Sequence, residues 1–213
     1  LVESRLRALG YLVSGESISL PDFRTSQNVL AYTRAPVRVV VLAHVDGVAG
    51  TPAANDNASG VAVLLELARV LRGTPGVLFA VTGAEERVQT GSRIHLGAAR
   101  LLELMDPALP RRVRLAVNLD MVGHGTRLHV RGIERRPNRS ARALLAAAPA
   151  ATYLRDPGWS DHAELTRGGM PAAWLQWRDD PCWHRACDRT GRVDAGKLAA
   201  TGEIALAAIR EAL

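Results

Sequence analysis

The sequence of 213 residues has a single lysine, only two cysteines and no long apolar run. The missing run excludes a transmembrane helix, which needs about 18 consecutive apolar residues. The first ten residues lack the apolar core of a signal peptide and favour an amphipathic helix that stops at Gly10, and a leader cleaved before residue 1 would leave no trace. Since 47% of the residues are hydrophobic, we expect one globular domain over residues 1–213.

The scarcity of lysine means that arginine carries the positive charge. Lys197 is the only lysine among 27 basic residues, and the formal net charge is +6. We attribute this bias to genomic base composition rather than to a partner. The densest basic segment, Arg131–Arg142, has arginines that can contact phosphates, but it lacks interleaved aromatic residues and resembles a polar connection before a helix. We expect no nucleic-acid partner, no membrane association and a monomer.

The two cysteines, Cys182 and Cys187, are five positions apart. A short disulfide, two free thiols and two thiolate ligands all fit this pair, whereas the Cys and His spacing of a structural zinc site is missing. A lone local pair favours a disulfide, and disulfides persist in oxidising compartments. We therefore expect a secreted or periplasmic protein.

Apolar runs alternate with helical patterns along the chain. Four continuous runs predict buried strands, at residues 39–42, 76–82, 113–119 and 172–177. Further strands are expected at residues 11–20 and 27–32, with an edge strand at 126–131. Helices are expected at residues 60–71, 92–104, 141–148 and 193–213, and residues 153–162 are expected to form a loop. The alternation predicts an α/β fold with an open, mixed, mostly parallel sheet flanked by helices.

Three of these strands are followed by carboxylates or an imidazole. His44 and Asp46 follow the first strand, Glu85 and Glu86 the second, and Asp120 the third. Any one of them alone is typical of a solvated loop. Because open α/β sheets place their sites outside the carboxyl ends of the strands, their recurrence indicates a common site.

Two further residues complete a candidate metal-ligand set. The set comprises His44, Asp56, Glu86, Asp120 and His184. Two imidazoles and three carboxylates suit two divalent ions about 3.5–4 Å apart with one bridging carboxylate. Zinc is the metal that these ligands favour, with manganese or cobalt as alternatives. Asp46 is placed to accept the second ring N–H of His44 and so fix its tautomer.

Glu85 is left over from this set and is the candidate proton carrier. Metal lowers the pKa of bound water toward about 7, and a nearby carboxylate can take its proton and return it to a leaving amine. The residues therefore predict hydrolysis of an amide or another acyl bond. Ser160, Asp161 and His162 are consecutive, so they cannot align as the nucleophile, orienter and base of a serine-protease triad.

Six motifs, in order along the chain, resemble those of the co-catalytic zinc aminopeptidases of metallopeptidase family 28, especially the secreted bacterial leucyl-aminopeptidase-like branch. They are AHVD (43–46), ANDNASGVA (54–62), TGAEE (82–86), NLDMVG (118–123), SDHAEL (160–165) and CWHRACD (182–188). The resemblance covers essentially the whole chain. It implies a zinc exopeptidase fold, two zinc ions and peptide substrates with a free N-terminus.

The resemblance also implies a role for each site residue. His44 and Asp120 would hold one zinc ion, Glu86 and His184 the other, and Asp56 would bridge them. Glu85 would be the general base and acid, and Asp46 would orient His44. The family's disulfide beside its last histidine ligand would correspond to Cys182–Cys187.

Trp183 is a departure from the family pattern. Some relatives have there a tyrosine whose hydroxyl helps to stabilise the tetrahedral intermediate, whereas an indole offers only an N–H. Either another donor serves or turnover is slower. We therefore treat Trp183 as a substrate-binding candidate. Trp159, Trp174 and Trp177 are candidates for the side-chain pocket, with a core position favoured for Trp174.

The expected function is removal of N-terminal residues, with apolar side chains slightly favoured. The same metal site could instead serve a carboxypeptidase, a dipeptidase or another amidohydrolase. Glutaminyl cyclases of this architecture use one zinc ion, so a full five-ligand set argues against them. A catalytically silent binding domain is disfavoured because every ligand position and Glu85 are present.

Overall fold

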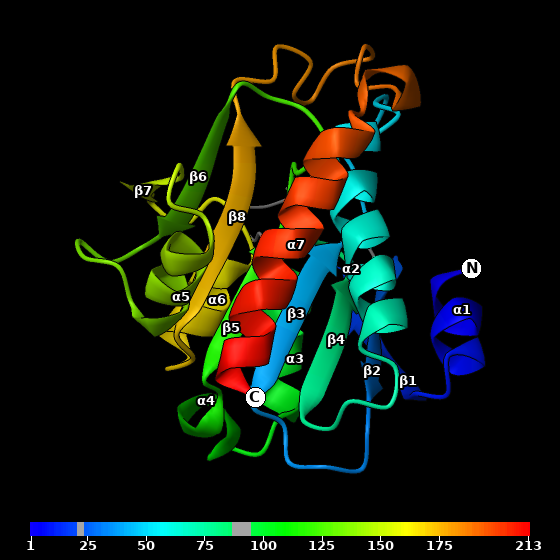
Figure 1. Ribbon diagram of the computed structural model, residues 1–213. Helices are drawn as coiled ribbons and strands as arrows, with labels where there is room; N and C mark the ends of the chain where they lie inside the picture. The colour runs from blue at the N-terminus through cyan, green and yellow to red at the C-terminus, as the bar shows by residue number, and fades with distance from the viewer. Residues whose placement is uncertain (21–23, 87–94) are drawn as a thin grey trace.

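An eight-stranded mixed sheet forms the centre of the computed structural model (Figure 1), which describes residues 1–20, 24–86 and 95–213. The strands are β1 (Leu12–Ser19), β2 (Thr25–Tyr32), β3 (Val39–His44), β4 (Val77–Thr82), β5 (Leu115–Leu119), β6 (Arg127–Gly132), β7 (Thr152–Arg155) and β8 (Ala172–Arg178). The helices are α1 (Val2–Ala8), α2 (Ser59–Val70), α3 (Leu96–Leu104), α4 (Leu109–Arg112), α5 (Arg139–Ala147), α6 (His162–Arg167) and α7 (Ala195–Ala212). Two short turns, η1 (Ala54–Ala58) and η2 (Thr190–Arg192), complete the described elements.

The strand order is β1-β2-β4-β3-β5-β8-β6-β7. The four strands β4, β3, β5 and β8 are parallel neighbours, so their carboxyl ends meet at one edge of the sheet. β1, β2 and β6 add antiparallel pairs on either side. This arrangement confirms the predicted α/β class with a mixed, mostly parallel sheet.

Two sequence predictions about the end of the sheet are wrong. β6 is not an edge strand, because β7 pairs with it in parallel and occupies the edge. Residues 153–162 are not all loop, since they contain most of β7 and the first residue of α6. β7 escaped detection because it has four residues and none of them is fully buried, so no period of two is visible. The start of the helix predicted at residues 92–104 lies partly outside the described residues.

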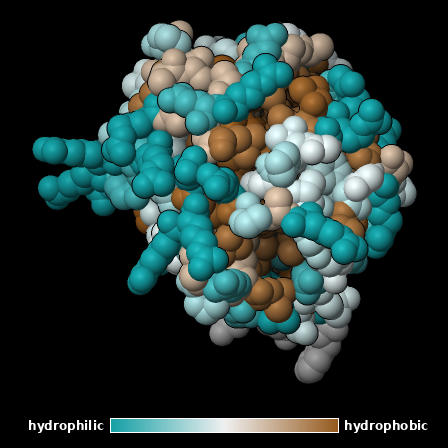
Figure 2. All heavy atoms as spheres, turned by 60° about the horizontal axis from the view of Figure 1, so that its bottom comes forward, coloured by the Kyte–Doolittle hydropathy of each residue, from teal (hydrophilic) through white to brown (hydrophobic). Residues whose placement is uncertain are grey.

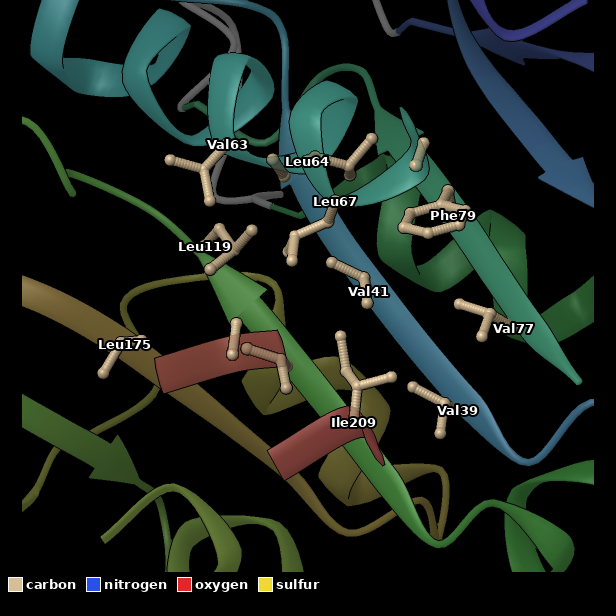
Figure 3. Packing of buried hydrophobic residues seen from close by; sticks show 14 of the residues in the cluster. Val39, Val41, Val63, Leu64, Leu67, Val77, Phe79, Leu119, Leu175 and Ile209 are labelled. Carbon is tan, nitrogen blue, oxygen red and sulfur yellow. The ribbon is translucent and has the colours of Figure 1, made fainter. Parts of the chain in front are cut away.

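The central strands are buried on both faces, which explains their unbroken apolar runs. Odd-numbered residues such as Val39 and Val41 pack against α2 and α7, where Figure 3 shows them beside Leu64, Leu67 and Ile209. Even-numbered residues of the same strand face α3 and α6. Because side chains alternate along a strand, His44 emerges at the end of β3 on this second face.

The amino ends of the central strands lie at the opposite end of the sheet, away from His44. Figure 2 views the molecule from that end and shows hydrophilic side chains around a band of apolar surface. Among the described residues, no helix is long and apolar enough to cross a membrane.

Candidate metal centre

The first group of candidate ligands joins β3, η1 and the end of β5. His44 is buried, and its Nε2 lies 3.3 Å from Oδ1 of Asp56 and 3.5 Å from Oδ1 of Asp120. Both carboxylates are also almost fully buried. One imidazole therefore faces two carboxylates at the carboxyl edge of the sheet.

The second group shares Asp56 with the first. Nε2 of His184 lies 3.2 Å from Oδ2 of Asp56 and 3.3 Å from Oε1 of Glu86. Asp56 thus presents one oxygen to each imidazole. The structure brings together all five predicted ligands, in the two groups that the resemblance implied.

These separations fit a metal better than they fit hydrogen bonds. Ligand atoms about 2.0–2.1 Å from a tetrahedral zinc ion lie roughly 3.3–3.4 Å from one another, whereas a charge-assisted N–H···O bond spans about 2.7–2.9 Å. Oδ1 of Asp120 is buried and has no hydrogen-bond partner among the described residues. A buried oxygen without a partner costs free energy unless something else satisfies it, and a cation would do so.

The side chains of the ANDNASG motif explain why Asp56 and Asp120 meet. Asn57 Nδ2 donates to the carbonyl oxygen of Leu119 at 2.9 Å, and Asn55 Oδ1 accepts from the N–H of Gly123 at 2.8 Å. Gly60 is required nearby, because a Cβ there would lie 2.2 Å from the same Leu119 carbonyl oxygen. These bonds join η1 to the turn that follows β5 on both sides of Asp120.

The proton balance of the cluster also favours cations. Burial disfavours charge on His44, but the carboxylates of Glu85 and Asp120 outweigh it and raise the pKa of His44 well above its usual value. The adjacent carboxylates of Asp56 and Glu86 raise the pKa of His184 to about 9 against the effect of its burial. Burial opposes ionisation of Asp56, yet the adjacent imidazoles of His184 and His44 hold its pKa below the usual range. Without metal the imidazoles therefore hold protons, which a bound ion must displace.

Glu85 lies beside the two groups and is buried. Loss of hydration on burial raises the pKa of Glu85 well above its usual value, and neighbouring carboxylates add to the effect while His44 opposes it. His95 Nε2 lies 3.6 Å from Glu85 Oε1, and His95 Nδ1 lies 3.5 Å from Glu164 Oε1. Sequence reasoning missed His95, because no strand end or motif marks it.

Asp46 has a different set of contacts from the one expected. The hydrogen-bond partner of His44 Nδ1 is the main-chain oxygen of Asp46 at 3.1 Å, whereas the Asp46 carboxylate lies 3.8 Å away. That carboxylate accepts the backbone N–H groups of Glu85 and Glu86, each at 3.1 Å. Residue 46 therefore orients the imidazole through its main chain and the two glutamates through its side chain.

Asp46→Asn is predicted to lower kcat by about 10- to 100-fold, the usual cost of losing an outer partner of a metal site. An asparagine keeps one acceptor oxygen and turns an amide donor toward a backbone N–H that needs an acceptor. The measurement is kcat at saturating substrate, with zinc content determined in parallel. An unchanged kcat would remove Asp46 from the positioning of Glu85 and Glu86.

The disulfide between Cys182 and Cys187 confirms the predicted pairing. It closes a six-residue loop around His184, whose backbone has a φ of +56°. A non-glycine residue in this left-handed region is disfavoured, so the closed loop helps to hold the imidazole in place.

Replacing both cysteines with serine is predicted to lower the free energy of unfolding by about 2 kcal/mol, from loop-closure entropy. The same variant is expected to bind zinc more weakly, because the His184 loop is freed. Chemical denaturation and competition with a zinc chelator measure the two effects. Reduction of the wild type by a thiol-free phosphine reductant is the matched treatment, and unchanged zinc affinity in both would separate the disulfide from the site.

A cavity opens beside the two ligand groups. Its wall includes Trp183, which is 45% exposed and stacks on Trp159 with ring centroids 6.3 Å apart. Trp174 is buried, as expected, and also borders the cavity. Trp177 is not in the wall, because its indole N–H bonds Thr201 of α7 at 3.2 Å. The roles of Trp183 and Trp159 toward substrate remain predictions.

An α/β sheet with two adjoining ligand groups at its carboxyl edge defines a candidate dinuclear metal domain. The profile of peptidase family M28 matches residues 28–209. The chain belongs to this family.

A protein and a solved structure that are named aminopeptidases are similar to this chain and are longer. The chain is 31% identical over 212 residues to aminopeptidase YwaD of Bacillus subtilis (strain 168), covering 89% of this chain and 45% of the relative. A zinc aminopeptidase structure from Bacillus subtilis is similar with a TM-score of 0.79 and 30% identity, covering 89% of this chain and 51% of that one. The chain therefore spans about half the length of these relatives.

A second solved structure is similar in fold alone. A glutaminyl cyclase from Porphyromonas gingivalis has a TM-score of 0.84 at 22% identity, covering 100% of this chain and 87% of that chain. The same sheet architecture thus occurs in an aminopeptidase and in a glutaminyl cyclase, so the fold alone does not determine the reaction.

Proposed function

We propose that the protein is a di-zinc aminopeptidase that hydrolyses the N-terminal peptide bond of peptides. The observation that carries the proposal is the shared carboxylate of Asp56, with one oxygen 3.3 Å from His44 and the other 3.2 Å from His184. His44 and Asp120 would hold one ion, and Glu86 and His184 the other. The relatives named aminopeptidases support the reaction class. Manganese or cobalt could replace zinc in such a ligand set.

Zinc ions held there would lower the pKa of a coordinated water and polarise the carbonyl of the scissile bond. The protein supplies the proton carrier. Glu85 is buried, and its raised pKa makes its carboxylate a stronger base that can accept a proton and release it to a leaving amine. His95, between Glu85 and Glu164, limits the positions that the Glu85 carboxyl can take.

The carboxylates of the site also favour a substrate with a free α-amine. The cavity wall contains Asp56, Glu85, Glu86 and Asp120, and a carboxylate oxygen there that does not hold a metal ion can accept a hydrogen bond. An ammonium group at the N-terminus of a peptide can donate such a charge-assisted bond. The disulfide supports action outside the cytoplasm.

The test uses metal-free protein reloaded with zinc. Hydrolysis of leucine p-nitroanilide, without hydrolysis of its N-acetyl derivative or of C-terminal substrates, is the expected result. Cleavage of N-blocked peptides alone would rule out an aminopeptidase and favour a carboxypeptidase. Ring closure of an N-terminal glutaminyl peptide, without any hydrolysis, would identify a cyclase instead.

A further inference from the structure

The cavity beside the metal centre has a basic end that the proposed mechanism does not use. Arg131 on β6 and Gln176 on β8 both border the cavity that Asp56 and Asp120 also line. They are only 6% and 4% exposed, respectively. Burying a guanidinium group and an amide costs free energy unless hydrogen-bond partners offset it, so the partners of these two side chains indicate their role.

The sheet fixes the position of Arg131. Arg131 lies directly opposite Trp174 in the β6–β8 register, and its guanidinium carbon lies 4.1 Å from the Trp174 ring centroid. The indole N–H of Trp174 in turn donates to the main-chain oxygen of Asp120 at 2.8 Å. One indole therefore separates the guanidinium group from a ligand of the metal centre.

Arg131 and Gln176 retain unused hydrogen-bond donors. Arg131 Nη1 donates to Gln176 Oε1 at 2.8 Å, which uses the acceptor of the amide. Among the described residues, Arg131 Nη2 has no hydrogen-bond acceptor, and Gln176 Nε2 has only the weak acceptor Met121 Sδ at 3.5 Å. This end of the cavity thus offers N–H groups for which residues 1–20, 24–86 and 95–213 supply no matching acceptor.

A purely structural ion pair does not account for Arg131. Asp156 is the nearest carboxylate, but its Oδ2 lies 3.6 Å from Arg131 Nε, which has no hydrogen-bond partner among the described residues. Asp156 is engaged elsewhere, with His162 Nε2 at 3.0 Å and the N–H of Gly158 at 2.6 Å. It balances part of the charge, and no other carboxylate in the described part of the chain pairs with the guanidinium group.

We propose that Arg131 and Gln176 bind a carboxylate of the substrate. The inference rests on the proposed function and sets its substrate class, in place of the slight apolar preference expected in the sequence analysis. A planar guanidinium group is suited to carboxylates, and its charge favours them over neutral amides. The carboxylate is either the side chain of an N-terminal Glu or Asp, or the α-carboxylate of a short peptide.

Two substrate pairs of matched shape test the proposal on zinc-loaded protein. The first pair is glutamate and glutamine p-nitroanilide, and the second is Leu-Gly and Leu-Gly-amide. In one pair, the substrate with the carboxylate is expected to have a kcat/KM higher by about 10- to 100-fold, the worth of a hydrogen bond to a charged group. This difference should come from a lower KM for that substrate. Preference in the first pair identifies the side chain, and preference in the second identifies the α-carboxylate.

Variants assign the preference to these residues. Arg131→Met keeps the stacking surface and removes the charge, so the preference should disappear. Gln176→Glu gives Arg131 a permanent partner and should also abolish it, which covers the case in which Arg131→Met does not fold. Arg178→Met is the matched control, because Arg178 borders the same cavity but is not part of the Arg131–Gln176 pair, and it should keep the preference.

Binding without turnover separates this proposal from the proposed function. Calorimetric titration of the zinc-loaded protein with L-glutamate and L-glutamine should give tighter binding of glutamate if the side chain is recognised. The same titration with Leu-Gly and Leu-Gly-amide on the Glu85→Gln variant tests recognition of the α-carboxylate, in which case Leu-Gly should bind more tightly. Hydrolysis of leucine p-nitroanilide with no carboxylate preference in either pair, or a preference that survives both variants, would overturn the inference while leaving the aminopeptidase intact.

Discussion

Glu85→Gln is expected to lower kcat by at least about 100-fold, the usual worth of general acid–base catalysis, while zinc remains bound. Glutamine keeps the shape of the side chain but cannot accept and return a proton. The reason to expect retained metal is that His44, Asp56, Glu86, Asp120 and His184 already form two groups without Glu85. The measurement is kcat on leucine p-nitroanilide together with zinc content after dialysis.

The outcome distinguishes two roles that the geometry allows for Glu85. His44, Glu85 and Glu86 also lie close enough to form a metal-ligand group, so loss of zinc in Glu85→Gln would make Glu85 a ligand. Near-normal turnover would remove it from the mechanism. Glu86→Gln, the same substitution one residue later, is the contrasting variant and is expected to lose zinc beside His184.

Asp56→Asn is expected to lower zinc affinity by more than the 10- to 100-fold that loss of an outer partner costs. Asp56 is the carboxylate common to both ligand groups. Asparagine has a single, neutral acceptor oxygen and its amide nitrogen only donates, so it cannot bind an ion on each side as a carboxylate can. Zinc content at a fixed free zinc concentration should fall below two ions per chain, and hydrolysis should fall with it.

The control for Asp56→Asn is Asp179→Asn. Asp179 also borders the cavity, but its carboxylate pairs with Arg127 at 2.8 Å rather than with a histidine. This variant should retain both ions and its activity. Two tightly bound ions in Asp56→Asn would show that the carboxylate does not bridge.

The parts of the site that could be predicted lie at strand ends. The runs at Val39–Leu42, Val77–Thr82 and Leu115–Leu119 are apolar because both faces of the sheet are covered. Such runs predict buried parallel strands, and neighbouring parallel strands have their carboxyl ends side by side. His44 and Asp120 meet for this reason alone.

The contacts that could not be predicted cross between segments with no common period. His95 reaches Glu85 from the residue before α3, and Arg131 reaches the cavity only because β6 pairs with β8. The sequence indicated a strand that ends at Arg131 but placed it at the edge of the sheet, so Arg131 was not assigned to the site. The split role of Asp46, with its main chain on His44 and its carboxylate on the following glutamates, depends on loop geometry that residue spacing does not encode.

Anomalous diffraction from zinc-soaked crystals would locate any ions bound between His44 and His184. We predict two peaks about 3.5–4 Å apart, one next to His44 and Asp120 and the other next to Glu86 and His184, with Asp56 between them. The absence of peaks, or a single peak at full zinc saturation, would show that the protein has no dinuclear zinc centre.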